Sequence, residues 1–307
     1  MERRGAALVL AIGMLGFPLF AAGKPETAQD SKSVTLIATI FPLYDFARNV
    51  GGDRVDVSLL LPPGLEAHGY EPTPHDMAKL SKTDVFVYTN PEMEGWAEKL
   101  IASIRSPRLI VVNASENIHL SDTGDPEHKG VDPHVWLDPL LARELVKAIA
   151  AGAHQVDPEG AAYYTANAET YIAKLERLHG DLEAGLKNLK TRTIVYGGHF
   201  AFGYFARRYK LEYISPYSGF SPDAEPTPKK VAELTEILQT TGNTTVFFEE
   251  LIEPRVATAL SKETGAKMVL LHGAHNVSKE ELKQGQNYLA IMRSNLEVPQ
   301  KALGSQE

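Results

Sequence analysis

The sequence predicts an α/β protein of two lobes, each a four-stranded, mainly parallel sheet with flanking helices, joined by one long α-helix. Short runs of β-branched residues alternate with stretches of helical spacing, which is typical of parallel sheets covered on both faces. A helical pattern then covers residues 158–189. After it the order of elements repeats, and Glu225-Pro-Thr-Pro stands where Glu71-Pro-Thr-Pro stood in the first half.

The first residues of the chain indicate export. Charged residues at 2–4 precede an apolar run over 6–20, and residues 20–23 offer a small-residue cleavage site. We therefore expect a signal peptide over 1–23 and a polar, flexible tether over 24–33. The apolar run is short for a membrane span, but an uncleaved amino-terminal anchor stays open as the alternative.

The first lobe, residues 34–157, is predicted to alternate four strands with helices. The strands are expected at 34–40, 55–61, 84–89 and 108–113, which are short runs rich in β-branched or apolar residues. Helices are expected over 41–50, from Pro74, over 94–104 and over 139–156. Thr73 is placed to cap the second of these helices, because Pro74 would be its first residue.

The predicted linking helix, 158–189, carries one apolar stripe. Its apolar residues recur at spacings of three and four and so share one face: Tyr164, Ala168, Tyr171, Leu175, Leu178, Leu182, Leu186 and Leu189. A helix of this length would measure roughly 48 Å, longer than a small domain is wide. We interpret it as a rod between two lobes. Two helices joined near Gly180 or Gly185 are the alternative.

The second lobe, residues 190–307, is predicted to repeat the first. Its strands are expected at 192–197, 211–215, 244–249 and 266–271. The stretch 199–206, after its first strand, resembles 41–47 in its aromatic residues. A duplicated α/β unit explains the shared order, and unrelated α/β segments of similar spacing are the alternative.

The composition narrows the classes of function. At 307 residues the chain is long enough for two domains, and a net charge of −8 without a basic stripe argues against a nucleic-acid partner. Because the chain has no cysteine, it lacks thiolate metal sites, a cysteine nucleophile and the usual acceptor of a lipid anchor. Nucleotide-binding and Gly-x-Ser-x-Gly fingerprints are absent too, which disfavours nucleotide and catalytic-triad chemistry.

Several histidines follow the predicted strands where those strands end. They are His68 and His134 in the first half, and His199, His272 and His275 in the second. Because ligands of open parallel sheets lie outside the carboxyl ends of the strands, we expect these rings on facing edges of the two lobes. One site between the lobes would then hold three histidines and a fourth group. This favours tetrahedral Zn²⁺ over Mn²⁺, which prefers more oxygen.

The stretch Asp132-Pro-His-Val-Trp-Leu-Asp-Pro is typical of a ligand loop. Its prolines stiffen the backbone on both sides of His134. Either Asp132 or Asp138 could accept a hydrogen bond from the ring N–H of His134 and so fix its tautomer. A helix start at Asp138-Pro139 that happens to follow a histidine is the alternative. We expect the other five histidines outside the permanent site, with His128 as a candidate transient ligand: His75, His119, His128, His154 and His179.

These residues resemble the zinc- and manganese-binding proteins of bacterial ABC importers, the cluster A-I solute-binding proteins. The resemblance covers residues 34–303 and rests on His68-Gly-Tyr-Glu-Pro-Thr-Pro, Asp132-Pro-His-Val-Trp-Leu-Asp-Pro, Gly198-His-Phe-Ala-Phe-Gly-Tyr-Phe-Ala, Gly219-Phe-Ser-Pro-Asp-Ala-Glu-Pro-Thr-Pro, Phe247-Phe-Glu-Glu and Tyr288-Leu-Ala-Ile-Met-Arg-Ser-Asn-Leu. It implies one transition metal ion in a cleft between two lobes, with His68, His134 and His199 as three ligands. The family's fourth ligand is commonly a carboxylate after the last strand. Here His275 is the candidate, with His272 as the substitute, and a histidine at this place favours the zinc type.

The resemblance implies a periplasmic or membrane-tethered protein that hands Zn²⁺ to an ABC permease at the inner membrane. We expect a monomer without enzymatic activity, whose linking helix permits only a small tilt of the lobes. Zinc affinity should fall as the histidines gain protons. The loop 117–130 offers only His119 and His128, so a histidine-rich metal-collecting loop is at best vestigial.

Three alternatives stay open. The first is a manganese- or iron-binding homologue with the same role. The second is a metallohydrolase with three histidines on zinc, in which Glu249 or Glu250 would act as the general base. The third is an adhesin, a role that is compatible with transport.

Overall fold

The structure is a computed structural model that describes residues 33–104, 106–122, 130–217, 226–241 and 243–304. From Ser33 onward the chain forms one compact unit. The predicted signal peptide, 1–23, and all but the last residue of the predicted tether lie outside the described residues. Of the helices in the described part, none is both long and apolar enough to cross a membrane.

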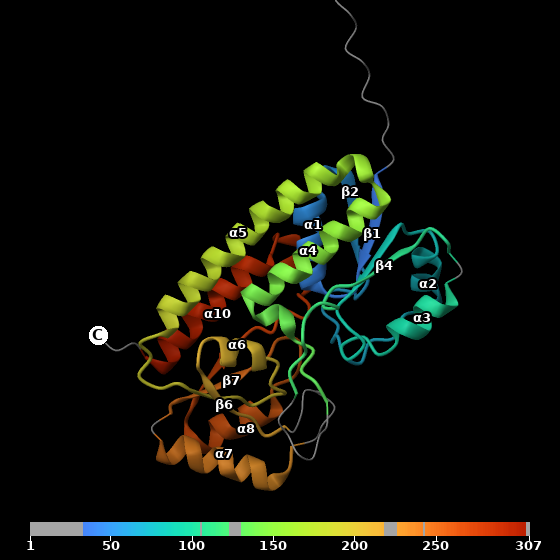
Figure 1. Cartoon of the computed structure of the whole chain (residues 1–307). Helices are drawn as coiled ribbons and strands as arrows, with labels where there is room; N and C mark the ends of the chain where they lie inside the picture. Colours follow the sequence, from blue (N-terminus) through green and yellow to red (C-terminus); the bar gives the residue numbers. More distant parts are fainter. Residues whose placement is uncertain (1–32, 105, 123–129, 218–225, 242, 305–307) are drawn as a thin grey trace, which may run out of the picture. The chain divides into compact units, whose positions relative to one another are not determined.

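The first lobe is built on a four-stranded parallel sheet, as predicted (Figure 1). Its strands are β1 (Val34–Ala38), β2 (Val55–Leu59), β3 (Val85–Tyr88) and β4 (Ile110–Asn113). They lie in the order β2-β1-β3-β4, and every pairing is parallel. The carboxyl ends of all four strands therefore meet along one edge of the sheet.

Helices cover both faces of this sheet. They are α1 (Phe41–Gly51), α2 (Pro74–Leu80), α3 (Ala97–Ser103) and α4 (Pro139–Val156), with short 3₁₀ turns η1 (Gly52–Arg54) and η2 (Val135–Leu137). Successive residues of β3 face opposite sides. Val85 and Val87 pack with α1 and α4, whereas Phe86 and Tyr88 pack with α2 and α3. The prediction of a parallel sheet buried on both faces is thus confirmed.

The same helix cap occurs in both lobes. Thr73 begins α2 as predicted, because its hydroxyl accepts the Asp76 amide at 3.3 Å while the Asp76 carboxylate accepts the Thr73 amide at 2.8 Å. In the second lobe, Thr227 accepts the Lys230 amide at 3.3 Å at the start of α7 (Pro228–Thr240). The repeated cap supports the predicted duplication.

The long helix α5 (Ala161–Leu186) is continuous and follows a 3₁₀ turn, η3 (Pro158–Gly160). Its 26 residues span about 39 Å. The predicted apolar stripe is buried from Tyr164 to Leu186. The helix passes Gly180 and Gly185 without a break, so the alternative of two joined helices is wrong. It ends at Leu186 rather than at the predicted Leu189.

The second lobe repeats the strand arrangement in a less continuous form. The strand β5 (Thr193–Val195) pairs with β6 (Glu212–Ile214), and β7 (Thr245–Phe248) pairs with β8 (Lys267–Leu270), both in parallel. One bridge between Tyr196 and Phe247 joins the two pairs, and the Gly197 amide donates to the Phe247 carbonyl at 2.8 Å. The four strands have the predicted direction and lie as two pairs rather than one unbroken ladder.

The last helix of the chain returns to the first lobe. The other helices of the second lobe are α6 (Gly203–Arg208), α8 (Arg255–Thr264), α9 (Lys279–Lys283) and α10 (Tyr288–Leu303). Figure 1 shows α10 alongside α5, and it also contacts α1. On α1, the Asp45 carboxylate accepts the Tyr171 hydroxyl of α5 at 2.8 Å and the Tyr288 amide of α10 at 3.3 Å. The end of the second lobe is therefore tied to the helices of the first.

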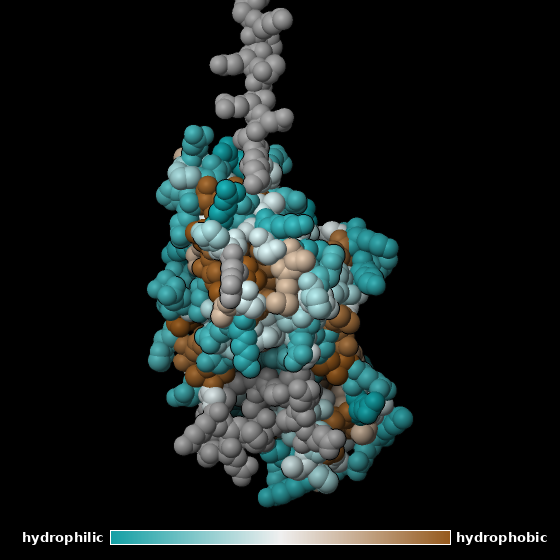
Figure 2. All heavy atoms as spheres, turned by 90° about the vertical axis from the view of Figure 1, so that its right-hand side faces the viewer, coloured by the Kyte–Doolittle hydropathy of each residue, from teal (hydrophilic) through white to brown (hydrophobic). Residues whose placement is uncertain are grey.

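The surface of the described part is mostly hydrophilic on the face shown in Figure 2, where apolar residues form separate patches. The large apolar side chains that are more than a third exposed are Leu65, Met77, Val111, Tyr163, Tyr213, Leu251 and Leu270. Two of these, Leu65 and Leu251, lie beside a depression that reaches His199 and His275.

Candidate metal site

Four histidines converge where the two lobes meet. Each offers one ring nitrogen, and these atoms all lie within 4.8 Å of one another. The four are His68, His134, His199 and His275. Within the part of the chain that the structure describes, no other group of three or more His, Asp or Glu side chains is close enough to hold a metal ion.

Each of the four follows the carboxyl end of a parallel strand. His68 lies in the loop after β2 and His134 in the loop after β4, while His199 and His275 follow β5 and β8. His134, His199 and His275 are 0%, 2% and 7% exposed, and His68 is half-buried. Parallel strands that end at facing edges thus bring together rings that are far apart in the sequence.

Asp132 orients His134. Its Oδ1 accepts the His134 backbone amide at 3.0 Å and lies 2.9 Å from Nδ1 of the ring. With its proton on Nδ1, the His134 ring donates this N–H to the Asp132 carboxylate. Its Nε2 then faces the other rings and lies 3.2 Å from Nε2 of His68. Asp138, the other aspartate considered for this role, instead caps α4 and pairs with Arg208 at 2.7 Å.

Glu249 takes the corresponding place beside His199. Its carboxylate contacts Nδ1 of the ring and accepts the His199 backbone amide at 3.2 Å. A side chain at Gly198 would displace the Glu249 carboxylate, because its Cβ would lie 2.5 Å from Oε1 of Glu249. Glu249 comes directly after β7, so His199 and its carboxylate partner belong to neighbouring strand ends.

Glu250 holds the turn that carries His275. Its Oε1 lies 3.4 Å from Nδ1 of both His275 and His272, and its Oε2 accepts the Gly273 amide at 2.6 Å. Nδ1 of His272 also accepts the Ala274 amide at 3.0 Å, which turns that ring toward its own loop. His275 therefore joins the other three histidines, and the substitute His272 lies outside the cluster.

The loop that carries His68 is tied to the second lobe. Asn276, the residue after His275, donates its side-chain amide to the carbonyls of Pro62 and Leu65 at 2.8 and 3.0 Å. Within the same loop, Glu66 accepts the His68 amide at 2.7 Å. The backbone around His68 is thus held from both lobes.

The electrostatic environment separates His275 from His68 and His134. Burial, reinforced by the neighbouring histidines, lowers the pKa of His68 to about 2 and holds the pKa of His134 well below its ordinary value. Burial opposes a charge on His275 and is the largest single effect, but the hydrogen bond and charge of Glu250, together with the charges of Glu249 and Glu66, raise its pKa. Although burial works in the opposite direction, His272 and His275 lower the pKa of Glu250 to about 2. Of these three histidines, His275 is therefore the one whose surroundings favour the protonated ring.

Two buried ring nitrogens indicate where a ligand would bind. Nε2 of His199 and Nε2 of His275 have no hydrogen-bond partner among the described residues. A buried polar atom left unpaired costs about 1–3 kcal/mol, so such atoms mark a place that a bound ligand would complete. Imidazoles at about 2.0–2.1 Å from a tetrahedral zinc ion lie roughly 3.3 Å apart. The 3.2 Å between Nε2 of His68 and Nε2 of His134 agrees with that separation.

The histidines expected outside the permanent site do lie elsewhere where the structure describes them. His75, His119 and His154 are exposed, and His179 on α5 has its Nδ1 3.2 Å from the Tyr209 hydroxyl. His128, the candidate transient ligand, is outside the described residues.

From the sequence, Glu249 and Glu250 were not predicted to contact histidines of the cluster. Both residues were considered only as general bases. Both carboxylates contact imidazoles instead. Their position directly after a predicted strand, like that of the histidines themselves, was the available sign that they would reach the same edge.

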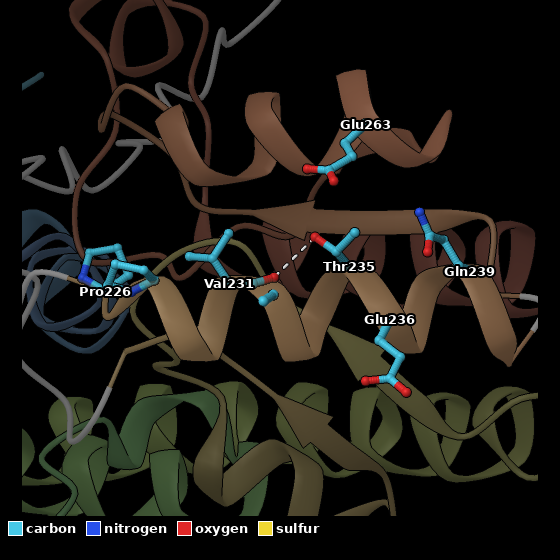
Figure 3. Close-up of a pocket in the computed structure, with 8 residues that line it drawn as sticks. Pro226, Val231, Thr235, Glu236, Gln239 and Glu263 are labelled. Carbon is cyan, nitrogen blue, oxygen red and sulfur yellow. Dashed lines mark hydrogen bonds between the residues drawn. The ribbon is translucent and has the colours of Figure 1, made fainter.

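Two hollows of the surface differ in chemistry. The depression over the cluster is lined by Leu65 and Glu66 of the first lobe and by His199, Leu251 and His275 of the second. A larger hollow lies between α7 and α8 (Figure 3). None of the described residues that line this second hollow is a histidine, so the described lining does not match the predicted metal site.

Comparison with known proteins points to one family. The model of the ZnuA family, described as zinc-uptake complex component A, periplasmic, matches residues 36–302. The high-affinity zinc uptake system protein ZnuA of Bacillus subtilis is 35% identical over 298 residues, covering 92% of this chain and 93% of that protein. The zinc-binding lipoprotein AdcA of Streptococcus pneumoniae is 34% identical and covers 91% of this chain. The match covers only 58% of AdcA, so this chain spans little more than half the length of that relative.

Solved structures show the same similarity. The Zn(II)-bound ZnuA-like domain of Streptococcus pneumoniae AdcA is 34% identical with a TM-score of 0.76, covering 88% of this chain and 99% of that one. The laminin-binding protein Lmb of Streptococcus agalactiae, described as bifunctional with adhesin and metal transporting activity, is 30% identical. Its TM-score is 0.79, and the match covers 88% of this chain and 100% of that one.

Proposed function

This chain belongs to the family of periplasmic A components of zinc-uptake complexes, and from this premise we propose that it captures Zn²⁺ outside the cytoplasm and delivers it to an ABC permease. The observation that carries the proposal is the convergence of four ring nitrogens, one from each histidine, which all lie within 4.8 Å of one another. His68 and His134 come from the first lobe, and His199 and His275 come from the second. One ion bound by all four would join the two lobes.

The ligand set suits zinc as cargo. Four imidazoles match the tetrahedral, nitrogen-rich coordination of Zn²⁺, whereas Mn²⁺ prefers more oxygen ligands. The lowered pKa values of His68 and His134 keep these rings neutral and able to bind. Because Glu250 contributes to the raised pKa of His275, zinc capture there displaces a proton at any pH at which the ring is charged.

Carboxylates hold three of the rings ready for the ion. A hydrogen-bonded carboxylate fixes the tautomer of a ligating histidine and raises its basicity. The three pairs are Asp132 with His134, Glu249 with His199, and Glu250 with His275. The ligand nitrogens therefore need little rearrangement when zinc enters.

We propose that the site binds zinc without catalysing a reaction. A fourth imidazole fills the coordination position that a hydrolytic zinc site keeps for water. Glu249 and Glu250, the possible general bases, are engaged by His199 and His275. Hydrolysis of an ester or phosphoester that is lost in His134→Ala would contradict this part of the proposal.

We further propose that the protein is a monomer and that a signal peptide over 1–23 directs its export. Residues 24–33 would form a tether between the signal peptide and the first lobe. In this proposal 34–157 and 190–307 are the two lobes and 158–189 the linker. The family's periplasmic description supports export. The packing of α10 on α5 supports a linker that is stiffened by a second helix.

Zinc competition titration of the purified protein tests the proposal. We expect one Zn²⁺ per chain and weaker binding of Mn²⁺. His134→Ala should lower zinc affinity by more than the roughly 10- to 100-fold that loss of an outer-shell partner costs. His154→Ala, on an exposed position of α4, is the matched control and should bind as the unmodified protein does. Absence of zinc uptake, or unchanged affinity in His134→Ala, would refute the function.

A further inference from the structure

Trp136 lies two residues after His134 and packs against a histidine of each lobe. Its ring centroid is 5.3 Å from that of His134 and 5.3 Å from that of His275, at interplanar angles of 71° and 81°. These are edge-to-face contacts within the favourable range for aromatic rings. Trp136 is 0% exposed. One buried indole thus contacts an imidazole from each lobe.

The indole N–H of Trp136 crosses from the first lobe to the second. It donates to the carbonyl of Gly273 at 2.9 Å, in the turn that carries His275. A second donor of the first lobe, the Phe41 amide, binds the His275 carbonyl at 3.1 Å. Two carbonyls of this second-lobe turn are therefore held by the first lobe.

The turn needs such external support. Ala274 has a φ of +58°, a left-handed conformation that costs a residue with a side chain about 1–2 kcal/mol. Gly273 is tightly packed, since a Cβ there would lie 2.6 Å from Nδ1 of His275. A strained, tightly packed turn keeps its geometry only where its surroundings hold it.

Trp136 itself is anchored from the other side. Its carbonyl accepts the hydroxyl of Tyr288, the first residue of α10. The Tyr288 amide in turn donates to Asp45 on α1 at 3.3 Å. A connected series of hydrogen bonds therefore leads from the helices to the His275 turn through the indole.

We propose that Trp136 is a positioning residue of the metal site, whose indole N–H sets the His275 turn of one lobe against the His134 loop of the other before zinc arrives. The inference rests on the proposed zinc site and adds a residue that does not itself bind the ion. A tryptophan that merely filled the core would act through its volume, whereas this role depends on its hydrogen bond to Gly273.

The variant Trp136→Phe separates these roles, because it keeps an aromatic ring and removes the N–H. An internal hydrogen bond of ordinary strength corresponds to about a 2- to 12-fold change in affinity. We expect zinc affinity in a competition titration to fall by that factor. Unchanged affinity would overturn the proposal.

A double-mutant cycle then distinguishes positioning from general damage to the fold. In a His275→Ala background, Trp136→Phe should have no further effect on zinc affinity, because the ring that it positions is gone. In a His199→Ala background it should keep its full effect, since Glu249 rather than Trp136 contacts the His199 ring and backbone. Equal, additive losses in both backgrounds would show a purely structural role and overturn the proposal.

Fluorescence gives an independent readout. The chain has two tryptophans, so Trp96→Phe leaves Trp136 as the single reporter. Trp96 packs near Phe86 and Tyr70 in the cluster under α2 and α3, and its replacement should leave zinc affinity unchanged. Trp136 emission should change and saturate at one zinc per chain.

If the unmodified protein binds no zinc, the proposed function fails. If it binds zinc and the cycle is additive, only the positioning role fails.

Discussion

Three histidines in the cluster each have a buried carboxylate beside Nδ1, the ring nitrogen that carries the N–H when Nε2 is free to bind an ion. The pairs are Asp132 with His134, Glu249 with His199, and Glu250 with His275. Burial raises the pKa of Asp132 to about 7, against the effect of the His134 amide, which donates to it. A dication bound at the proposed site would favour the ionised carboxylates and neutral imidazoles together, and so would stabilise the charge state in which these residues can bind it.

Zinc affinity should fall as pH drops through the raised pKa of His275. Below that pKa the ring carries a proton that zinc must displace, whereas His68 and His134, with lowered pKa values, do not compete in this range. Each displaced proton lowers the apparent affinity about tenfold per pH unit below its pKa, and Asp132, whose pKa is about 7, adds to the slope of His275 where it is protonated. Competition titrations between about pH 8 and pH 5 measure this slope.

Glu250→Gln is the matched variant for this pH dependence. It removes the charge that raises the pKa of His275, so the fall in affinity should begin at lower pH. Affinity at high pH should also decrease, because the neutral amide supports the ring less strongly. An onset at the same pH as in the unmodified protein would show that Glu250 does not control the proton on His275.

The helices α5 and α10 pack side by side and connect the two lobes. Gly185 allows their close approach, since a Cβ there would lie 2.6 Å from the ends of both Leu296 and Gln300. The Gln300 side chain also donates to the Gly185 carbonyl at 3.1 Å. At Gly180 on the same helix, none of the described neighbours comes within 4 Å of the place that a Cβ would take, so this glycine serves no such contact.

These two glycines should respond differently to alanine. Gly180→Ala should raise the free energy of unfolding by about 0.5–1 kcal/mol, because it reduces the freedom of the unfolded chain and adds no clash. Gly185→Ala should gain less or lose stability, since Leu296 and Gln300 must move. Denaturant unfolding of the two variants measures the difference. An equal gain in both would mean that the contact between α5 and α10 is loose.

At the scale of the whole molecule, the lobes are joined by more than the linking helix. Asn276 binds the Pro62 and Leu65 carbonyls, and Trp136 binds Gly273 across the lobes. The helix α10 packs along α5 as well. These connections support the expectation of a small tilt rather than a wide hinge closure when the ion binds.

Zinc should therefore stabilise the protein with little change of shape. At free zinc about 100-fold above the dissociation constant, binding to the native state alone adds about 2.7 kcal/mol to the free energy of unfolding. Thermal unfolding should show this as a raised midpoint that His134→Ala loses. Small-angle scattering curves with and without zinc should nearly coincide. A large decrease in the radius of gyration on adding zinc would contradict a stiff connection between the lobes.

Patterns within short stretches of sequence predicted the local elements and the sheet edge near which the clustered histidines lie. The apolar stripe from Tyr164 to Leu186, the Thr73 cap and the β-branched runs act over a few residues, so pattern alone predicted the strands β1 to β8 and the helices α1 to α5. The helices α8, α9 and α10 were not predicted. His68, His134 and His199 could be predicted as candidate metal ligands for a similar reason. Each follows a parallel strand, and the carboxyl ends of parallel strands share one edge.

The side chains that complete the cluster depend on contacts between segments far apart in the sequence. The choice of His275 over His272, and of Asp132 over Asp138, depends on how each ring or carboxylate is turned by contacts outside its own loop. The bond from Trp136 to Gly273 joins residues 137 positions apart. Local periodicity carries no information about such pairs, because they arise from the packing of one lobe against the other.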